Sequence, residues 1–231
     1  DPGELLYLRQ ASQTAQQAVD LDPQSDYGYV AMADVLDLMG NGDKGLALLS
    51  DAETSGIPPS WRFYFSRARL IADRSNTKKV LGLLETALAF NKTHPKIILP
   101  YVIAILKSES QGKKLISSLQ DWNNRYPSSL LALTLAIEYE ENSEHIKAHK
   151  IYTQIIKESP KDREANINDA VILYKHLGRS KTAIKQLQLV LNNTSENSPN
   201  FVKSIIHAHI GSAYVHLKQF KNAEKSFARA I

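Results

Sequence analysis

The amino-acid sequence predicts an all-α protein, an α-solenoid of stacked antiparallel helix hairpins. Two observations lead to this prediction. Prolines recur along the 231 residues at intervals of 35, 37, 32, 33 and 39, and most of the segments between them place apolar residues at the three- and four-residue spacing of an amphipathic helix. A period in the thirties is typical of repeat proteins in which each helical unit packs on the next. The prolines that mark the period are Pro23, Pro58, Pro95, Pro127, Pro160 and Pro199.

The composition is that of a folded protein, with 43% hydrophobic and 23% charged residues. The absence of cysteine excludes disulfides, thiolate metal sites and a cysteine nucleophile. No apolar run approaches the 18 residues that indicate a membrane span, so we expect a soluble protein, cytoplasmic or periplasmic. The last residues, 227–231, lie inside a predicted helix with no polar closing helix after it. We therefore expect a fragment of a longer array.

Charge is distributed unevenly along the chain. Residues 1–60 contain ten acids against two bases, and the remaining residues contain 26 bases against 14 acids. Solvated helix faces are the ordinary interpretation of such a pattern. An acidic end and a basic body also favour head-to-tail association of copies, or an acidic partner.

The last repeat has the clearest hairpin pattern. Residues 205–217 place apolar side chains at helical spacing, a short turn follows at 218–222, and a second apolar stripe begins at Ala223. Gly211 and Ala223 have small side chains that would let two helices approach closely. Tyr214 and Phe227 would fill the adjacent space. The segment is therefore predicted to form two antiparallel helices.

These residues resemble the tetratricopeptide repeat, a helix–turn–helix pattern of 34 residues. Gly211 takes position 8 of the pattern, Tyr214 position 11, Ala223 position 20 and Phe227 position 24. Residues at equivalent positions recur upstream. They are Ala11, Ala15 and Ala18; Tyr27, Ala31, Leu49 and Ala52; Ala68, Ile71, Val80, Leu84 and Ala87; Ala104, Leu115, Leu119 and Trp122; Ala136, Tyr139, Ala148, Tyr152 and Ile155; and Tyr174, Ala183, Leu187 and Val190.

The resemblance implies one right-handed superhelix over residues 1–231, consisting of a half unit and six full units. Gly40 and Gly178 mark turns inside hairpins, and Asp162 marks the start of a helix. The half unit spans 4–23, and the full units span about 24–57, 58–95, 96–127, 128–160, 161–199 and 200–231.

Candidate chemistry is scarce in this sequence. His145 and His149 are one helical turn apart and are able to bind zinc in principle, but the metalloprotease helix motif is incomplete around them. The acidic cluster near Glu140 lacks a second catalytic group. No Gly-rich phosphate loop and no nucleophile elbow are present. We predict no catalytic residue, no metal and no cofactor, and hence no enzyme.

The stretch between residues 61 and 79 is rich in basic and aromatic residues, so we consider whether it binds nucleic acid. Arg62, Arg67, Arg69 and Arg74 lie among aromatic residues, a mixture that binds phosphates and stacks bases in some proteins. At least one of these aromatics is needed for the hairpin core, and the two-residue base code of RNA-reading helical repeats is absent. The sequence therefore disfavours nucleic acid as a partner.

The resemblance to the tetratricopeptide repeat also implies a binding surface. In that family the first helix of each unit lines a concave groove that binds a peptide segment or a partner subunit. Transferred position by position, the predicted groove residues are Arg62, Phe65, Arg69, Asp73, Tyr101, Ile105, Glu109, Asn168, Ile172, Lys175, His176, Ser212 and His216.

The predicted function is a protein–protein interaction scaffold. The uneven repeat lengths resemble bacterial arrays that serve envelope assembly, polysaccharide export or secretion. Two alternatives stay open: a self-association module that forms a homo-oligomer, and a non-catalytic region of a multidomain enzyme.

Overall fold

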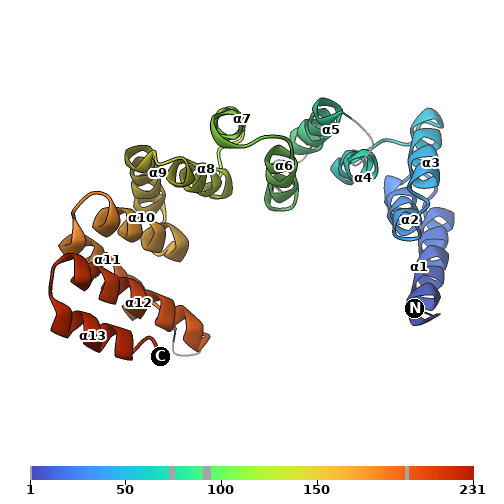
Figure 1. Cartoon of the computed structure of the whole chain (residues 1–231). Helices are drawn as coiled ribbons and strands as arrows, with labels where there is room; N and C mark the ends of the chain where they lie inside the picture. Colours follow the sequence, from blue (N-terminus) through green and yellow to red (C-terminus); the bar gives the residue numbers. More distant parts are fainter. Residues whose placement is uncertain (1, 73–75, 91–94, 196–197) are drawn as a thin grey trace. The chain divides into compact units, whose positions relative to one another are not determined.

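The computed structural model describes residues 2–72, 76–90, 95–195 and 198–231, and every regular element within these ranges is an α-helix (Figure 1). This confirms the predicted all-α class. The helices group into two compact units, Asp1–Glu109 and Ser110–Ile231. The boundary falls between the two helices of the predicted unit 96–127, and a single domain over 1–231 stays a prediction. None of the described helices combines the length and the hydrophobicity that crossing a bilayer requires.

The first unit contains two helix hairpins with one helix on either side of them in the chain. Helix α2 pairs with α3 and α4 with α5, while α1 packs on α2 and α6 packs on α5. Buried apolar side chains between the hairpins, including Ala33, Leu49 and Phe63, form its core. The helices are α1 (Pro2–Leu21), α2 (Asp26–Leu38), α3 (Gly42–Thr54), α4 (Trp61–Ile71), α5 (Thr77–Phe90) and α6 (Pro95–Glu109).

The second unit contains three consecutive hairpins preceded by one helix. Helix α7 packs on α8, and each later helix packs on the next one along the chain. Its largest core cluster lies among α10, α11 and α12 and includes Tyr174, Leu187 and Ile206. The helices are α7 (Gly112–Arg125), α8 (Ser129–Glu141), α9 (His145–Glu158), α10 (Arg163–Lys175), α11 (Ser180–Asn192), α12 (Asn200–His216) and α13 (Phe220–Ala228).

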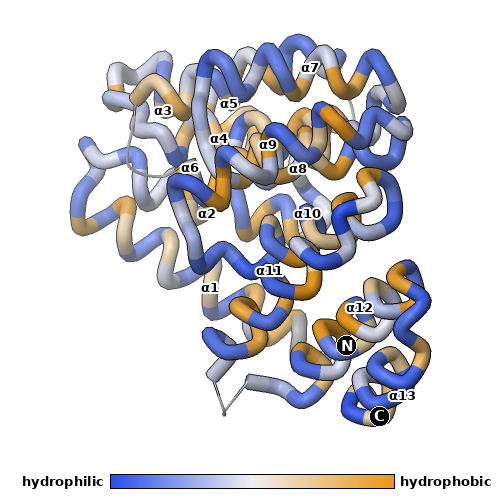
Figure 2. The backbone as a smooth tube through the Cα atoms, turned by 90° about the vertical axis from the view of Figure 1, so that its left-hand side faces the viewer, coloured by the Kyte–Doolittle hydropathy of each residue, from blue (hydrophilic) through white to orange (hydrophobic). Residues whose placement is uncertain are grey.

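Side-chain caps explain where several helices begin. The Ser128 hydroxyl accepts a hydrogen bond from the Leu131 N–H, and the Asp162 carboxylate accepts one from the Ala165 N–H, 2.9 Å away. In the first unit the Asp26 carboxylate accepts a hydrogen bond from the Ser60 N–H at 2.6 Å. The start of α2 is thus tied to the start of α4. Figure 2 shows apolar and polar residues alternating along each helix, as helices buried on one face require.

The expected close approach in the last hairpin is present. A Cβ atom on Gly211 would lie 2.7 Å from the ring of Phe227, so a larger residue there would require that ring to move at the contact between α12 and α13. The predicted turn glycines are also found in turns, since Gly40 and Gly178 have φ angles of 74° and 66°.

In the repeat at 24–57 the sequence register was wrong for the first helix. Ala31, placed at the small buried position, is exposed, whereas Ala33 is fully buried. The reason is Gly45 on α3, because a Cβ atom there would lie 2.8 Å from the Ala33 carbonyl oxygen. The backbones of α2 and α3 meet at Ala33 and Gly45. The small position of the repeat pattern in α2 is therefore Ala33, two residues further along the chain than the predicted Ala31. Leu49 and Ala52 are buried as predicted.

The register predicted for α6 was also wrong. Ala104, expected at the small buried position, is exposed, and the buried face consists of Ile98, Leu99, Val102 and Leu106. The helix runs unbroken through Pro100. The pattern of small residues therefore does not describe this helix.

Candidate partner-binding surfaces on the first helices

The first helices of the hairpins are α2 and α4 in the first unit, with α6 following them, and α8, α10 and α12 in the second. In the first unit they bring together a set of half-buried and exposed side chains that we call the arginine–aromatic surface. Of the predicted groove residues it includes Arg62, Phe65, Arg69 and Tyr101, all half-buried. Ile105 is half-buried and Glu109 is exposed at the end of α6. Asp73 lies outside the described residues. The arginine–aromatic surface consists of Tyr27, Asp34, Asp37, Arg62, Phe65, Arg69 and Tyr101.

Arg62 is held between two aromatic rings. Its Nη1 donates a hydrogen bond to the Tyr27 hydroxyl at 3.1 Å. The guanidinium carbon lies 5.0 Å from the centroid of the Tyr27 ring and 4.6 Å from that of Trp61. Cation–π attraction favours both positions. Arg62 therefore occupies a fixed place between α2 and α4.

An aromatic pair links α4 to α6. The rings of Phe65 and Tyr101 meet edge to face with centroids 5.7 Å apart, and Trp61 lies 6.3 Å from Phe65. Edge-to-face packing is a preferred geometry for aromatic pairs. The two half-buried rings thus offer apolar surface that is already ordered.

Arg69 faces two acids of α2. Its Nη1 lies 3.5 Å from Asp34 Oδ1, and its Nη2 lies 3.8 Å from Asp37 Oδ2. The Ser66 hydroxyl donates a hydrogen bond to Asp34 Oδ1 at 2.6 Å. The positive charge of Arg69 is therefore compensated within the surface. No groove residue was predicted in the repeat at 24–57, so sequence reasoning missed Tyr27, Asp34 and Asp37. The Gly45 contact with Ala33 was the signal that would have found them.

The basic stretch that suggested nucleic acid is largely engaged with its own chain. Arg67 Nη1 forms an ion pair with Glu53 Oε2 at 2.5 Å, and Arg69 is paired as described. The rings of Trp61 and Phe63 are buried, so they are not free to stack on bases. Arg74 lies outside the described residues. These contacts favour a structural role for the stretch.

In the second unit, four histidines from α9, α12 and the end of α10 make ring contacts with one another or with Tyr174. The rings of His145 and His176 stack with centroids 3.6 Å apart. The Tyr174 hydroxyl lies 3.2 Å from His209 Nδ1, and the ring of His216 contacts Tyr174 edge to face at 5.3 Å. We call these histidines, together with Lys175, the imidazole surface. Of the predicted groove residues it contains Lys175, His176 and His216. It consists of His145, Lys175, His176, His209 and His216, and the buried Tyr174 contacts His209 and His216.

The local environment changes the protonation of two of these histidines. Burial, with smaller effects from His145, Lys175 and His216, lowers the pKa of His176 below its ordinary 6.5. Burial, with a smaller effect from Lys175, likewise lowers the pKa of His209. Both side chains are therefore biased towards the neutral imidazole, which is able to donate as well as accept a hydrogen bond.

The remaining predicted groove residues of the second unit, Ile172, Asn168 and Ser212, differ in their burial and their hydrogen bonds. Ile172 is fully buried, which corrects its assignment to the groove. Helix α10 contacts α9, α11 and α12, and so most of its circumference is covered. Asn168 is half-buried beside Tyr152, with which it shares a hydrogen bond. Ser212 is half-buried, and its hydroxyl donates to the Ala208 carbonyl at 3.0 Å.

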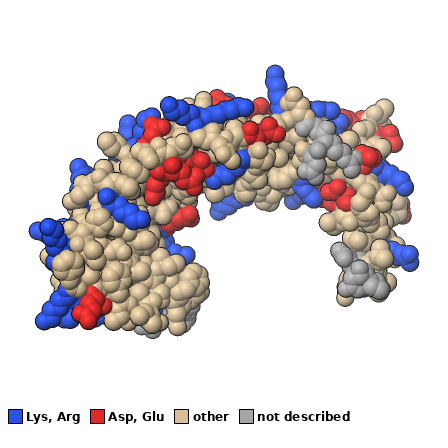
Figure 3. Space-filling view, in the orientation of Figure 1, with Lys and Arg blue, Asp and Glu red and all other residues tan. Residues whose placement is uncertain are grey.

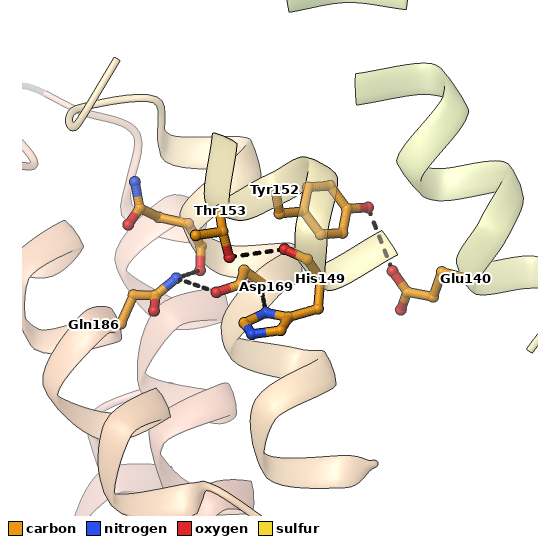
Figure 4. Close-up of polar contacts among 7 residues, drawn as sticks. Glu140, His149, Tyr152, Thr153, Asp169 and Gln186 are labelled. Carbon is orange, nitrogen blue, oxygen red and sulfur yellow. Dashed lines mark hydrogen bonds and ion pairs between the residues drawn. The ribbon is translucent and has the colours of Figure 1, made fainter. Parts of the chain in front are cut away.

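A polar network beside this surface is structural (Figure 4). The buried Asp169 carboxylate lies 2.5 Å from His149 Nδ1 and accepts a hydrogen bond from Gln186 Nε2 at 3.2 Å. Buried carboxylates require such partners. The two histidines considered for zinc thus have different neighbours, Asp169 for His149 and His176 for His145. Among the described residues, no group of three or more potential ligands is arranged to bind a metal.

Glu140, on α8, interacts electrostatically with His145 and Lys175 of the imidazole surface. Burial raises its pKa, and hydrogen bonding to Tyr152 and the charges of His145 and Lys175 oppose that rise. The Tyr152 hydroxyl donates to Glu140 Oε2 at 3.4 Å (Figure 4). Burial likewise raises the pKa of Tyr152. The tyrosine therefore stays protonated and serves as a donor.

Comparison with known proteins shows the fold. No family model and no curated protein matches this sequence. Among solved structures, the C-terminal part of a TPR repeat-containing protein from Cytophaga hutchinsonii is similar with a TM-score of 0.68 and 10% identity, over 97% of this chain and 89% of that chain. MamA AMB-1 is similar with a TM-score of 0.51 and 18% identity, over 74% of this chain and 89% of that chain.

Proposed function

Because the chain has the fold of tetratricopeptide-repeat proteins, we propose that it is a scaffold that binds a peptide segment or a partner subunit on its first helices. The observation that carries this proposal is the order of the arginine–aromatic surface. Arg62 is fixed between Tyr27 and Trp61, and Phe65 is fixed against Tyr101. Aromatic and arginine side chains are the residues that most often dominate binding energy at protein interfaces.

Order in the free protein favours binding, because little side-chain entropy remains to be lost when a partner arrives. In the second unit, the imidazole surface adds hydrogen-bonding groups on the first helices α10 and α12 and at the start of α9. Catalysis receives no comparable support. The buried Asp169, paired with the half-buried His149, accepts a hydrogen bond from Gln186, and the second hydrogen bond from that amide goes to the Asn166 carbonyl oxygen. This network holds helices together.

The uneven repeat lengths resemble those of certain bacterial repeat arrays, and this resemblance suggests where to look for the partner. Envelope assembly, polysaccharide export and secretion are the processes that such arrays serve, and we propose them as the first settings to search. If the chain is part of a multidomain enzyme, we propose the same partner-binding role for it within that enzyme.

Peptide display tests the proposal without knowledge of the partner. A random peptide library is selected on the chain, and the binders are measured against Tyr27→Ala and Phe65→Ala. Lys79→Ala is the control, since Lys79 is exposed on the second helix α5. We expect a class of binders that loses tenfold or more in affinity to both surface variants and less than twofold to the control. Binders that are indifferent to both surface variants would refute the proposal, provided that circular dichroism shows the variants folded.

Self-association is a second candidate, and the charge distribution favours it. Residues 1–60 have a net charge of −8 and residues 161–231 of +6, counted from ten acids and two bases and from five acids and 11 bases. Light scattering across a salt series tests it. A charge-driven oligomer dissociates as salt rises, because screening shortens the range of the attraction. A mass that stays monomeric at low salt and high protein concentration excludes this candidate.

A further inference from the structure

The hairpin of α12 and α13 carries an exposed apolar face. Phe220 is 66% exposed, and Val215 and Phe227 are exposed as well. These side chains line an open hollow of about 520 Å³ along α13 and the end of α12, in which Glu224 is the charged lining residue. Contiguous exposed apolar surface of this kind marks interaction sites in folded proteins. We call it the α13 face, and it consists of Val215, Phe220, Ala223, Phe227, Ala228 and Ile231.

In the preceding hairpin the equivalent positions are covered. Ser180 of α11 takes the repeat position that Phe220 takes in α13, and Ile184 likewise corresponds to Glu224. Both residues of α11 are buried, in a helix that packs on α10 as well as on α12. Phe220 and Glu224 are exposed. The covering that this repeat gives to such a face is another helix, so we expect a helix as the occupant of the α13 face.

Helix α1 of the first unit has an open stripe of its own. It packs on α2, and Ala15 is the one buried residue among those of α1 whose side chains the structure describes. Tyr7 is 72% exposed and Leu21 is 85% exposed. Between them, small exposed residues continue the stripe at helical spacing. We call it the α1 stripe, and it consists of Tyr7, Ala11, Thr14, Ala18 and Leu21.

The α1 stripe and the α13 face are complementary in side-chain size. The α13 face presents the large rings of Phe220 and Phe227, whereas the middle of the α1 stripe consists of alanine and threonine. Small residues on one helix leave grooves into which the larger side chains of another helix pack. Contact between two α13 faces would instead place large side chains against each other. Size therefore favours α1 as the helix that covers this face.

Charge favours the same pairing. Residues 215–231 contain four bases against one acid, whereas residues 1–60 contain ten acids against two bases. The four bases are exposed, and none forms an ion pair within the part of the chain that the structure describes. Figure 3, in the view of Figure 1, shows uncharged surface over α12 and α13 with basic side chains at its edge. The four bases are Lys218, Lys221, Lys225 and Arg229.

The first unit supplies acids close to the α1 stripe. Asp20 and Asp22 are exposed on either side of Leu21 in the sequence. Opposite charges around an interface attract and orient the partners. Two α13 faces in contact would bring the cations of both copies together, which is unfavourable.

From this combination we propose that copies of this chain associate head to tail, with the α1 stripe of one copy on the α13 face of the next. Such an interface is heterologous, since each copy contributes a different surface to it. The inference rests on the self-association candidate above and adds the two surfaces in contact. Salt screens the attraction between charges but does not remove the gain from burying apolar surface. Part of the association therefore persists at high salt.

Two complementary variants test the pairing by sedimentation velocity. The double variant Tyr7→Ser with Leu21→Ser removes the α1 stripe, and Phe220→Ser removes the centre of the α13 face. All three side chains are more than half exposed, so we expect both variants to fold, and circular dichroism checks this. Leu189→Ser is the matched control, because it replaces an exposed apolar side chain on α11.

We expect the association constant to fall at least tenfold in each of the two variants and less than twofold in the control. An equimolar mixture of the two variants is expected to form dimers, because one variant keeps the α13 face and the other keeps the α1 stripe. A mixture that stays monomeric overturns the pairing, and so does a stripe variant that still associates with itself. An oligomer that salt dissociates but that both variants leave unchanged upholds the self-association candidate and refutes these surfaces. A chain that is monomeric under all conditions refutes both.

Discussion

The ring of Phe227 occupies the space that a side chain on Gly211 would need. A Cβ atom at Gly211 would lie 2.7 Å from both Cδ1 and Cε1 of that ring. The contact joins the two helices of the last hairpin, α12 and α13.

Gly211→Leu is therefore expected to destabilise the last hairpin by overpacking, at roughly 1–3 kcal/mol. Gly82 is the control, because it lies in the helix α5 with nothing within 4 Å of the added Cβ. Gly82→Ala is expected to stabilise by about 0.5–1 kcal/mol, since alanine is the better helix former. Urea unfolding measures both changes. If the two substitutions changed the free energy of unfolding equally, the contact between Gly211 and Phe227 would not contribute to the stability of the hairpin.

Arg69 has a structural role besides any role in binding. Arg69→Ala leaves Asp34 and Asp37 without their cation, so we expect a loss of at most about 1 kcal/mol, as for other partly exposed ion pairs. A double-mutant cycle of Arg69→Ala with Asp37→Ala measures the coupling. It should shrink as salt is raised. A coupling of zero at low salt would show that the pair does not link α2 and α4.

Acidification is expected to destabilise the second unit through His176 and His209. Both have folded-state pKa values below 6.5, the value in the unfolded chain. Between the folded and unfolded values the unfolded chain holds more protons, so stability rises with pH in that window. The contribution is complete above about pH 6.5 and is lost as the pH falls towards the folded value. Urea unfolding at pH 7.5 and 5.5 should show the loss, and His209→Gln should reduce it. If the His209→Gln variant lost as much stability between pH 7.5 and 5.5 as the unmodified chain, His209 would not be a source of the pH dependence.

His149 supports the buried Asp169 carboxylate, whose side chain is 4% exposed. His149→Ala leaves that carboxylate with Gln186 as its partner. We expect a loss of roughly 1–3 kcal/mol, the cost of an under-satisfied buried acceptor. His207→Ala, at a half-buried position of α12, is the control, and thermal melting compares the two variants. Similar melting temperatures for both variants would show that the network contributes little.

The fold was predictable from the sequence because the repeat pattern describes contacts between helices that are neighbours along the chain. Gly211 with Phe227, and Leu49 with Ala52, occupy the places that their spacing indicated. Ala31 was misplaced because two alanines two residues apart, Ala31 and Ala33, both fit the small position on one helix. Only the approach of Gly45 from the facing helix distinguishes them.

The binding surface was less predictable, because it depends on side chains from different repeats. Ile172 sits at a groove position of the pattern, yet three neighbouring helices cover α10 and bury it. The links from Arg62 to Tyr27 and from Arg69 to Asp34 join residues 35 positions apart. A pattern within one repeat does not contain this information.

Amide hydrogen exchange tests the central claim most directly. The chain is measured alone and with a selected peptide whose binding depends on Phe65. The account predicts that protection increases in α2, α4 and α6, which contribute Tyr27, Phe65 and Tyr101 to the arginine–aromatic surface. Protection confined to the second helices α3 and α5 would contradict it.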